Sequence, residues 1–253
     1  MQKAYIVGGL LLGAAIIAAL ILVPRWMEQQ APPPSPEGPV ASEPVAVPEP
    51  ETLAPALPLA EPEPPLPSLD DSDALVAEAL APMEIPAPWV GKGDLIRRLA
   101  VVIENAARGD YPRRQLAFLS PAGPFRVLKG DDGTLLMDPA GYARYDGYVD
   151  MLEMMPAEEM AGLLIRVQPL LDEALQELGL REPGDALLDA AIEQVLAVPV
   201  LEGDVPLLQP NVLYEFADPV LEALSPLQKQ ILRTGPDNVR RIQAYLRQVR
   251  EAF

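Results

Sequence analysis

The stretch PAEEMAGLLIRVQPLLDEALQELG, residues 156–179, carries the clearest structural signal in this chain of 253 residues. Apolar side chains recur in it about every three or four positions, at Met160, Leu163, Leu164, Val167, Leu171, Ala174, Leu175 and Leu178. This rhythm is typical of a helix that buries one face, and Gly179 stands where such a helix ends. Pro169 predicts a kink, because the carbonyl of Ile165 loses its hydrogen-bond donor. We therefore expect a long helix here.

Signals that start a helix occur on both sides of this stretch. Asp94 precedes an apolar run, and Asp138 precedes Pro139, which suits a first helical position. Ser225 and Gln228 have the spacing of a capping box. A last helix is expected after Gly235, with an apolar stripe at Val239, Ile242, Leu246, Val249 and Phe253.

Residues 125–137 have a different pattern. Two short apolar runs, FRVL and TLLM, flank the turn sequence KGDDG, which predicts a β-hairpin. The fold class expected for the soluble domain, residues 69–253, is therefore mostly α, with one small β-hairpin.

Residues 4–23, AYIVGGLLLGAAIIAALILV, contain no charged side chain and are long enough to cross a bilayer as one helix. A cleaved signal peptide has a shorter apolar region, of about 7–15 residues, so we predict an uncleaved anchor. Lys3 and the amino terminus favour a short cytoplasmic tail at residues 1–3. In a bacterium this orientation places the remainder of the chain in the periplasm. Gly9 and Gly13 have the spacing that allows two such helices to form a homodimer.

Residues 24–68 are expected to form a disordered, proline-rich acidic linker, because 14 of the 38 residues at 31–68 are prolines. Its extended reach is at most about 120 Å. The chain has a net charge of −18, and residues 26–91 contain 12 acidic and no basic residues. Such a polyanion is not expected to bind nucleic acid. The chain has no cysteine and no histidine, so neither a cofactor nor a metal site is predicted.

Two groups of side chains are candidates for binding. Arg144, Tyr145 and Tyr148 form a polar and aromatic group, in which Arg144 and Tyr148 would share one face of a helix. The alternative is an internal network that joins Arg144 and the tyrosines to buried partners such as Asp218.

The last 29 residues carry six basic and two acidic side chains. Arg240, Arg247 and Arg250 share one side of the last helix with Gln243, and this face could dock an anionic partner. The alternative is a solvated face that pairs with acidic residues of the same domain.

Several segments resemble an uncharacterised proteobacterial family, catalogued as domain of unknown function 3014. They are RYDGYV at 144–149, PLLDEA at 169–174, YEFADPVLE at 214–222, SPLQKQILRTGP at 225–236 and, less extensively, DDSD at 70–73. Leu175 departs from the family, which often has an aromatic residue there. The resemblance implies a bacterial envelope location and carries no activity.

These observations predict a single-pass protein of the bacterial inner membrane, with a cytoplasmic N-terminus and a periplasmic C-terminal domain. Its tethered domain is expected to bind an envelope protein or a cell-wall polymer, and no catalytic residue is assigned. The alternative is a hydrolase of the cell wall that uses two carboxylates among Asp146, Asp218 and Glu222, since paired carboxylates can act as acid and base.

Overall fold

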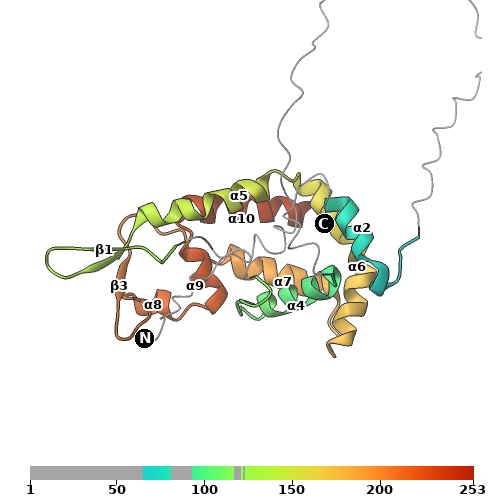
Figure 1. Cartoon of the computed structure of the whole chain (residues 1–253), viewed down its shortest axis with the longest axis horizontal. Coiled ribbons are helices and arrows are strands. Elements are labelled where there is room, and N and C mark those ends of the chain that lie inside the picture. The colour runs from blue at the N-terminus through green and yellow to red at the C-terminus, as the bar shows by residue number, and fades with distance from the viewer. Residues whose placement is uncertain (1–64, 81–92, 117–120, 122) are drawn as a thin grey trace, which may run out of the picture. The chain divides into compact units, whose positions relative to one another are not determined.

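The computed structural model describes residues 65–80, 93–116, 121 and 123–253. The predicted anchor and nearly all of the predicted linker lie outside these residues. In the described part of the chain, no helix is long and apolar enough to cross a membrane. The elements, with 3-10 helices marked η, are η1 (Leu69–Asp71), α2 (Asp73–Leu80), α4 (Leu95–Ala107), β1 (Val127–Lys129), β2 (Leu135–Met137), η4 (Pro139–Arg144), α5 (Asp146–Glu153), α6 (Ala157–Glu177), α7 (Gly184–Leu196), β3 (Pro206–Leu208), β4 (Glu215–Phe216), α8 (Pro219–Glu222), α9 (Pro226–Leu232) and α10 (Pro236–Ala252) (Figure 1).

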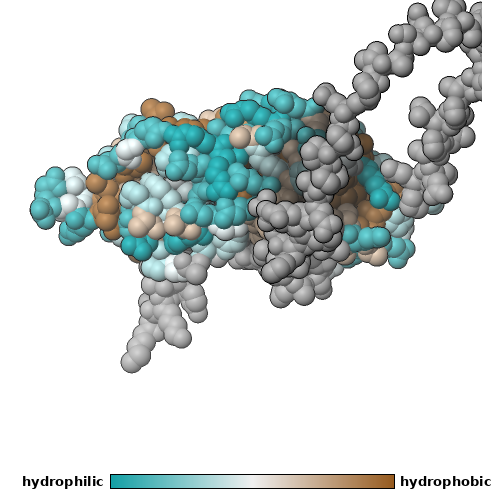
Figure 2. Space-filling model, turned by 90° about the horizontal axis from the view of Figure 1, so that it is seen from above, coloured by the Kyte–Doolittle hydropathy of each residue, from teal (hydrophilic) through white to brown (hydrophobic). Residues whose placement is uncertain are grey.

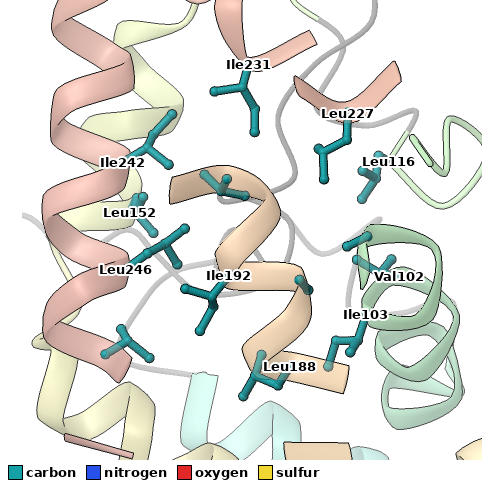
Figure 3. Packing of buried hydrophobic residues seen from close by; sticks show 14 of the residues in the cluster. Val102, Ile103, Leu116, Leu152, Leu188, Ile192, Leu227, Ile231, Ile242 and Leu246 are labelled. Carbon is teal, nitrogen blue, oxygen red and sulfur yellow. The ribbon is translucent and has the colours of Figure 1, made fainter. Parts of the chain in front are cut away.

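The centre of the domain is α7, which packs against α4, α6, α9 and α10. Its side chains Leu188 and Ile192 lie between Ile103 of α4 and Leu246 of α10 (Figure 3). All four of these side chains are at most 2% exposed. Because α7 contributes to each of these contacts, the helices share one continuous hydrophobic core.

The helix expected from residues 156–179 is α6, and its predicted apolar face is largely buried. Pro169 lies inside the helix and on its exposed side. Ile165, whose carbonyl faces the position of the missing amide hydrogen, is 47% exposed, so water can take the place of that donor. Leu178 was expected in the buried stripe, but it is 49% exposed at the C-terminal end of the helix.

The last helix, α10, buries the predicted positions Val239, Ile242, Leu246 and Val249, each at 1% exposure or less. Phe253 was also expected in the stripe, and it is 37% exposed just after the helix ends. Gln243 was predicted on the face that carries the arginines, but this side chain is buried. Its amide donates hydrogen bonds to the carbonyls of Val195, Leu196 and Val198 at 2.8–3.2 Å, and so satisfies the C-terminal end of α7.

The predicted hairpin is confirmed as the antiparallel pair β1 and β2, in which Val127 lies opposite Met137. The prediction of a single hairpin is wrong, because β3 and β4 extend it to a four-stranded antiparallel sheet in the order β1-β2-β3-β4. Leu135 of β2 lies opposite Leu207 of β3. Strands of two or three residues carry too little alternation to be recognised locally, and their partners define them.

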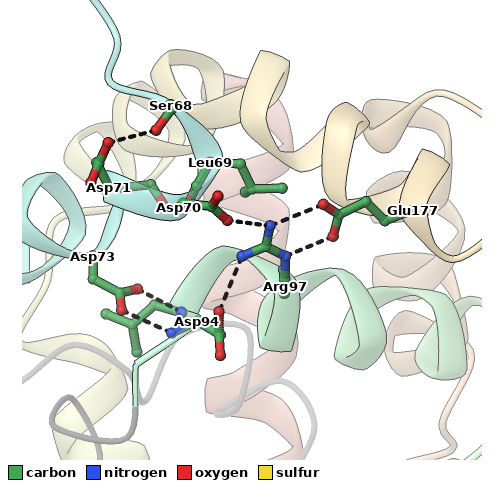
Figure 4. Close-up of polar contacts among 10 residues, drawn as sticks. Ser68, Leu69, Asp70, Asp71, Asp73, Asp94, Arg97 and Glu177 are labelled. Atoms are coloured by element: carbon green, nitrogen blue, oxygen red, sulfur yellow. Dashed lines mark hydrogen bonds and ion pairs between the residues drawn. The ribbon is translucent and has the colours of Figure 1, made fainter.

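The N-terminal acidic residues hold the start of the domain together (Figure 4). Asp94 was expected to cap α4, but its side chain makes no capping bond. The cap comes instead from Asp73, whose two carboxylate oxygens accept the backbone amides of Asp94 and Leu95, both at 2.8 Å. Gly93 and Asp94 have positive φ angles of 69° and 53°, and this turn points both amides at the carboxylate.

A second interaction in the same region centres on Arg97 of α4. Its guanidinium donates to Glu177 of α6 at 2.6 and 2.9 Å, to Asp70 at 2.7 Å and to Asp94 at 3.1 Å. The bonds to Glu177 and Asp70 raise the pKa of Arg97 above its ordinary value. Arg97 therefore joins η1, α4 and α6 through Asp70 and Glu177.

We predict that Asp73→Ala lowers the free energy of unfolding by about 0.5–2 kcal/mol, as expected for a lost helix cap. Urea denaturation followed by circular dichroism would measure the loss. Asp71→Ala is the matched control, because the side-chain hydrogen bond of Asp71 comes from the exposed hydroxyl of Ser68. Equal losses in the two variants would contradict the capping role of Asp73.

Candidate functional site

The predicted group at Arg144, Tyr145 and Tyr148 does not lie on one helix. The 3-10 helix η4 ends at Arg144, and α5 begins at Asp146. The expectation of one helix across Arg144 and Tyr148 is therefore wrong. Asp138 caps η4 through the amide of Ala140 at 2.9 Å, as its position before a proline predicted, and Tyr145 is the junction between the two helices.

Arg144 is held by backbone carbonyls. Its guanidinium donates to Gly141 at 2.9 Å and to Pro124 at 2.9 Å, with a longer bond of 3.5 Å to Gly123. It also lies over the Tyr145 ring, 5.1 Å from the centroid, and donates to the tyrosine hydroxyl at 3.3 Å. These contacts fix the segment before β1 against η4.

Tyr145 is only 1% exposed, and burial raises the pKa of its hydroxyl, although the nearby charges of Arg144 and Arg233 act in the opposite direction. Tyr148 is half-buried, and burial also raises the pKa of its hydroxyl. Tyr145 can therefore orient Arg144, while the aromatic ring itself belongs to the core.

Arg233, at the end of α9, lies beside this group. Its guanidinium carbon is 5.8 Å from the centroid of the Phe125 ring and 5.6 Å from that of Phe216, over the face of each ring. Phe125 also packs on Tyr214 with 5.9 Å between ring centroids. We call Phe125, Arg144, Tyr145, Tyr214, Phe216 and Arg233 the arginine–aromatic cluster. Residues from the end of η4, the end of α9, the start of β1 and β4 thus meet in one place.

The turn between α9 and α10 fixes the position of Arg233. Gly235 has a φ of 90°, and a Cβ atom there would lie 2.4 Å from the Tyr142 ring. The buried side chain of Asn238 donates to Asp146 at 2.9 Å and to the Thr234 carbonyl at 3.1 Å. The turn therefore joins α10 to η4 and α5, and holds Arg233 close enough to Tyr145 for its charge to act on the tyrosine hydroxyl. Sequence reasoning missed this role, although Gly235 before Pro236 was recognised as a helix start.

The arginines predicted on the last helix lie near acidic side chains. Arg240 forms ion pairs with Glu202 and Asp237, and Arg250 pairs with Asp189 at 2.7 Å and Glu193 at 2.8 Å. Arg247 is exposed and has no ion pair within the described residues. Binding of an anionic partner to Arg240 or Arg250 would therefore compete with the acids of the domain itself.

The carboxylates proposed for hydrolysis all have structural partners. Asp146 accepts from Asn238, and Asp218 accepts from the amide of Val220 at 2.8 Å, which caps α8. Glu222 accepts from the Lys229 ammonium at 2.6 Å and from the Phe216 amide at 2.8 Å. Burial alone would raise the pKa of Glu222, but these bonds outweigh it and the net shift is downward. A general acid requires the opposite shift.

No group of three or more Asp, Glu, His or Cys side chains could hold a metal ion within the described part of the chain. The chemistry that the arginine–aromatic cluster can perform is recognition of a negatively charged group, because guanidinium and aromatic rings supply N–H donors and apolar contact area.

A family described as "Protein of unknown function (DUF3014)" matches residues 95–250 of the chain. The matched range starts at the first residue of α4 and ends within the last turn of α10, so it includes the whole arginine–aromatic cluster. The resemblance recognised in the sequence is confirmed. No curated protein and no solved structure matches the chain.

Gly235→Ala is expected to lower the free energy of unfolding by about 2–4 kcal/mol, because it combines a left-handed backbone with a direct clash against Tyr142. Gly179→Ala is the matched control. Gly179 has a similar φ of 81° and open space at its Cβ, so its loss should be about 1–2 kcal/mol. Denaturation of both variants would measure the difference, and equal losses would contradict the close contact.

Proposed function

The chain belongs to DUF3014, a family of proteins of unknown function, and we propose that it is a membrane-anchored envelope protein whose helical domain binds a protein or a cell-wall polymer. Residues 4–23 anchor it in the bacterial inner membrane, with the N-terminus in the cytoplasm and the C-terminal domain in the periplasm. Residues 24–68 serve as the tether. Gly9 and Gly13 provide a face through which two anchors can associate.

The observation that carries the proposal is the arginine–aromatic cluster. Residues 92–253 contain 17 basic and 25 acidic residues, so most cations could find an acid within the domain. Arg144 and Arg233 nevertheless make no hydrogen bond or ion pair to a carboxylate among the described residues. Arg144 is held by backbone carbonyls and by the Tyr145 ring, whereas Arg233 lies over two aromatic rings. An arginine next to aromatic side chains and without an ion pair among the described residues favours a binding surface over a structural ion-pair network.

The face of α10 supports the proposal less strongly. Arg240, Arg247 and Arg250 remain proposed contacts, but acids of the domain neutralise Arg240 and Arg250. We therefore propose the arginine–aromatic cluster as the main surface and Arg247 as an accessory contact.

The topology predicts the behaviour of a reporter fused after Phe253. Alkaline phosphatase, which folds only after export, should be active in this fusion, because Lys3 and the amino terminus favour the cytoplasmic side. Enzyme assays on intact cells would measure the activity. An inactive fusion, together with fluorescence from a cytoplasm-only reporter at the same position, would overturn the orientation.

Crosslinking in intact cells tests the binding surface. A photoreactive amino acid at Leu213, which is 66% exposed and adjoins Tyr214, should give a discrete adduct in the membrane fraction. The same residue at Leu178, which is 49% exposed at the end of α6, is the control and should give none. An adduct from position 247 and none from position 213 would move the interface to α10.

A further inference from the structure

Arg233 differs from the other arginines that contact aromatic rings or acids in this domain. Its side chain is partly buried, and its charge lies over two phenylalanine rings. No oxygen atom of the described residues accepts any of its five N–H groups. Burial accordingly lowers the pKa of Arg233 below its ordinary value, although the group stays protonated near neutral pH. A desolvated guanidinium without an acceptor costs free energy that a bound anion would recover.

The nearest acidic group is already occupied. The charge of Glu222 acts on Arg233 through space, but one carboxylate oxygen of Glu222 accepts from Lys229 and the other accepts from the amide of Phe216. Two successive amides near β4 have different acceptors. The Phe216 amide donates to Glu222, whereas the Ala217 amide donates to the carbonyl of Pro206 in β3. Glu222 therefore stabilises β4 beside the cluster and, within the described residues, makes no hydrogen bond to Arg233.

Further positive charge and apolar surface adjoin Arg233. Arg113 is exposed, has no ion pair among the described residues, and is close enough to act on the charge of Arg233. Val212 and Leu213 directly precede Tyr214 and are 74% and 66% exposed. Figure 2 shows hydrophobic surface directly behind the hydrophilic end of the molecule where the β1–β2 hairpin lies. Tyr214, whose ring packs on Phe125, connects this exposed apolar pair to the rings beneath Arg233.

We propose that Arg233 binds the carboxylate of an acidic peptide segment of a partner protein, with the apolar neighbours of that carboxylate packed on Tyr214 and Leu213. This inference rests on the proposed binding function and names the chemistry that the domain recognises. The planar fork of a guanidinium matches a carboxylate in a bidentate arrangement. Arg144 holds Pro124 next to Phe125 and so positions one of the two rings beneath Arg233.

The charge pattern favours a peptide over a membrane or a nucleic acid. Binding to anionic lipid uses clusters of about four to eight basic residues, and binding to nucleic acid uses a broad basic face. The body of this domain is net acidic, so only a local, short-range contact with one or two carboxylates is favourable. The exposed side chains of Val212 and Leu213 can contact apolar side chains of a peptide. Inorganic phosphate has no apolar group that could make such a contact.

The experiment uses the full chain in neutral detergent micelles, with ¹⁵N-labelled arginine. The probe is a blocked tripeptide with a central glutamate between two leucines, titrated to millimolar concentration. The Nε–H resonance of Arg233, identified by its absence in Arg233→Lys, should shift in a saturable manner. The tripeptide with glutamine in place of glutamate should leave the resonance unchanged.

Two variants test the role of the planar guanidinium group of Arg233, and calorimetry measures peptide binding to each. Arg233→Lys retains the charge, and Arg233→Gln removes it. Both should weaken peptide binding by about tenfold or more, the loss expected for a charge-assisted pair. Arg181→Gln, at an exposed arginine with no ion pair in the described residues, should bind as the unchanged chain does. If Arg233→Gln unfolds, Arg233→Lys decides the outcome, with folding checked by circular dichroism.

Other outcomes would overturn the proposal. These are equal binding of the glutamine peptide, no saturable shift, an unchanged affinity in Arg233→Lys, or an equal shift of the Arg233 resonance by inorganic phosphate. Sedimentation with phosphatidylglycerol vesicles that depends on Arg233 would assign the surface to lipid instead. If the peptide binds at Arg233 but position 213 gives no adduct in cells, the site stands and the proposed envelope function fails. If position 213 gives an adduct in cells but the peptide does not bind, the proposed envelope function stands and the carboxylate site at Arg233 fails.

Discussion

The close contact between Gly235 and the Tyr142 ring joins the turn between α9 and α10 to η4. Only a residue without a side chain can bring the backbone this near to the ring, and the left-handed φ of 90° also favours glycine. Asn238 strengthens the junction through hydrogen bonds to Asp146 and to the turn itself. The contact orients α10 against α5 and places the end of α9 beside η4. The position of Arg233, two residues before Gly235, depends on this contact.

Charged side chains in this domain have two roles. Several arginines join elements that are distant in sequence, as Arg97 joins α4 to α6 and Arg241 joins α10 to Asp150 and Glu153 of α5. These side chains are partly exposed, so each ion pair contributes little to stability, of order 0–1 kcal/mol. These ion pairs instead help to determine which helix faces pack against each other. Arg233 has no such partner among the described residues, and ring faces in place of oxygen atoms surround it.

The candidate site was only partly visible in the sequence. Arg144 and Tyr145 stood out as an arginine next to an aromatic residue, and the structure places both in the arginine–aromatic cluster. Arg233 could be seen only as one of several basic residues near the C-terminus. Its neighbours Phe125 and Phe216 lie 108 and 17 positions before it in the chain, and no local spacing connects them. A fold that brings β1, β4 and α9 together was needed to reveal the contact.

The sequence alone determined several of the helices, because their signals are local, although it did not show the break between η4 and α5. The 3.6-residue rhythm of α6, the capping box at Ser225 and the proline after Asp138 act within one or two turns of the chain. Tertiary structure decided which groups meet across the chain. It assigned the cap of α4 to Asp73 instead of Asp94, paired Arg250 with α7, and added β3 and β4 to the hairpin. Hydrogen bonds of this kind depend on the distance between atoms in the folded domain, and the spacing of residues along the chain does not specify that distance.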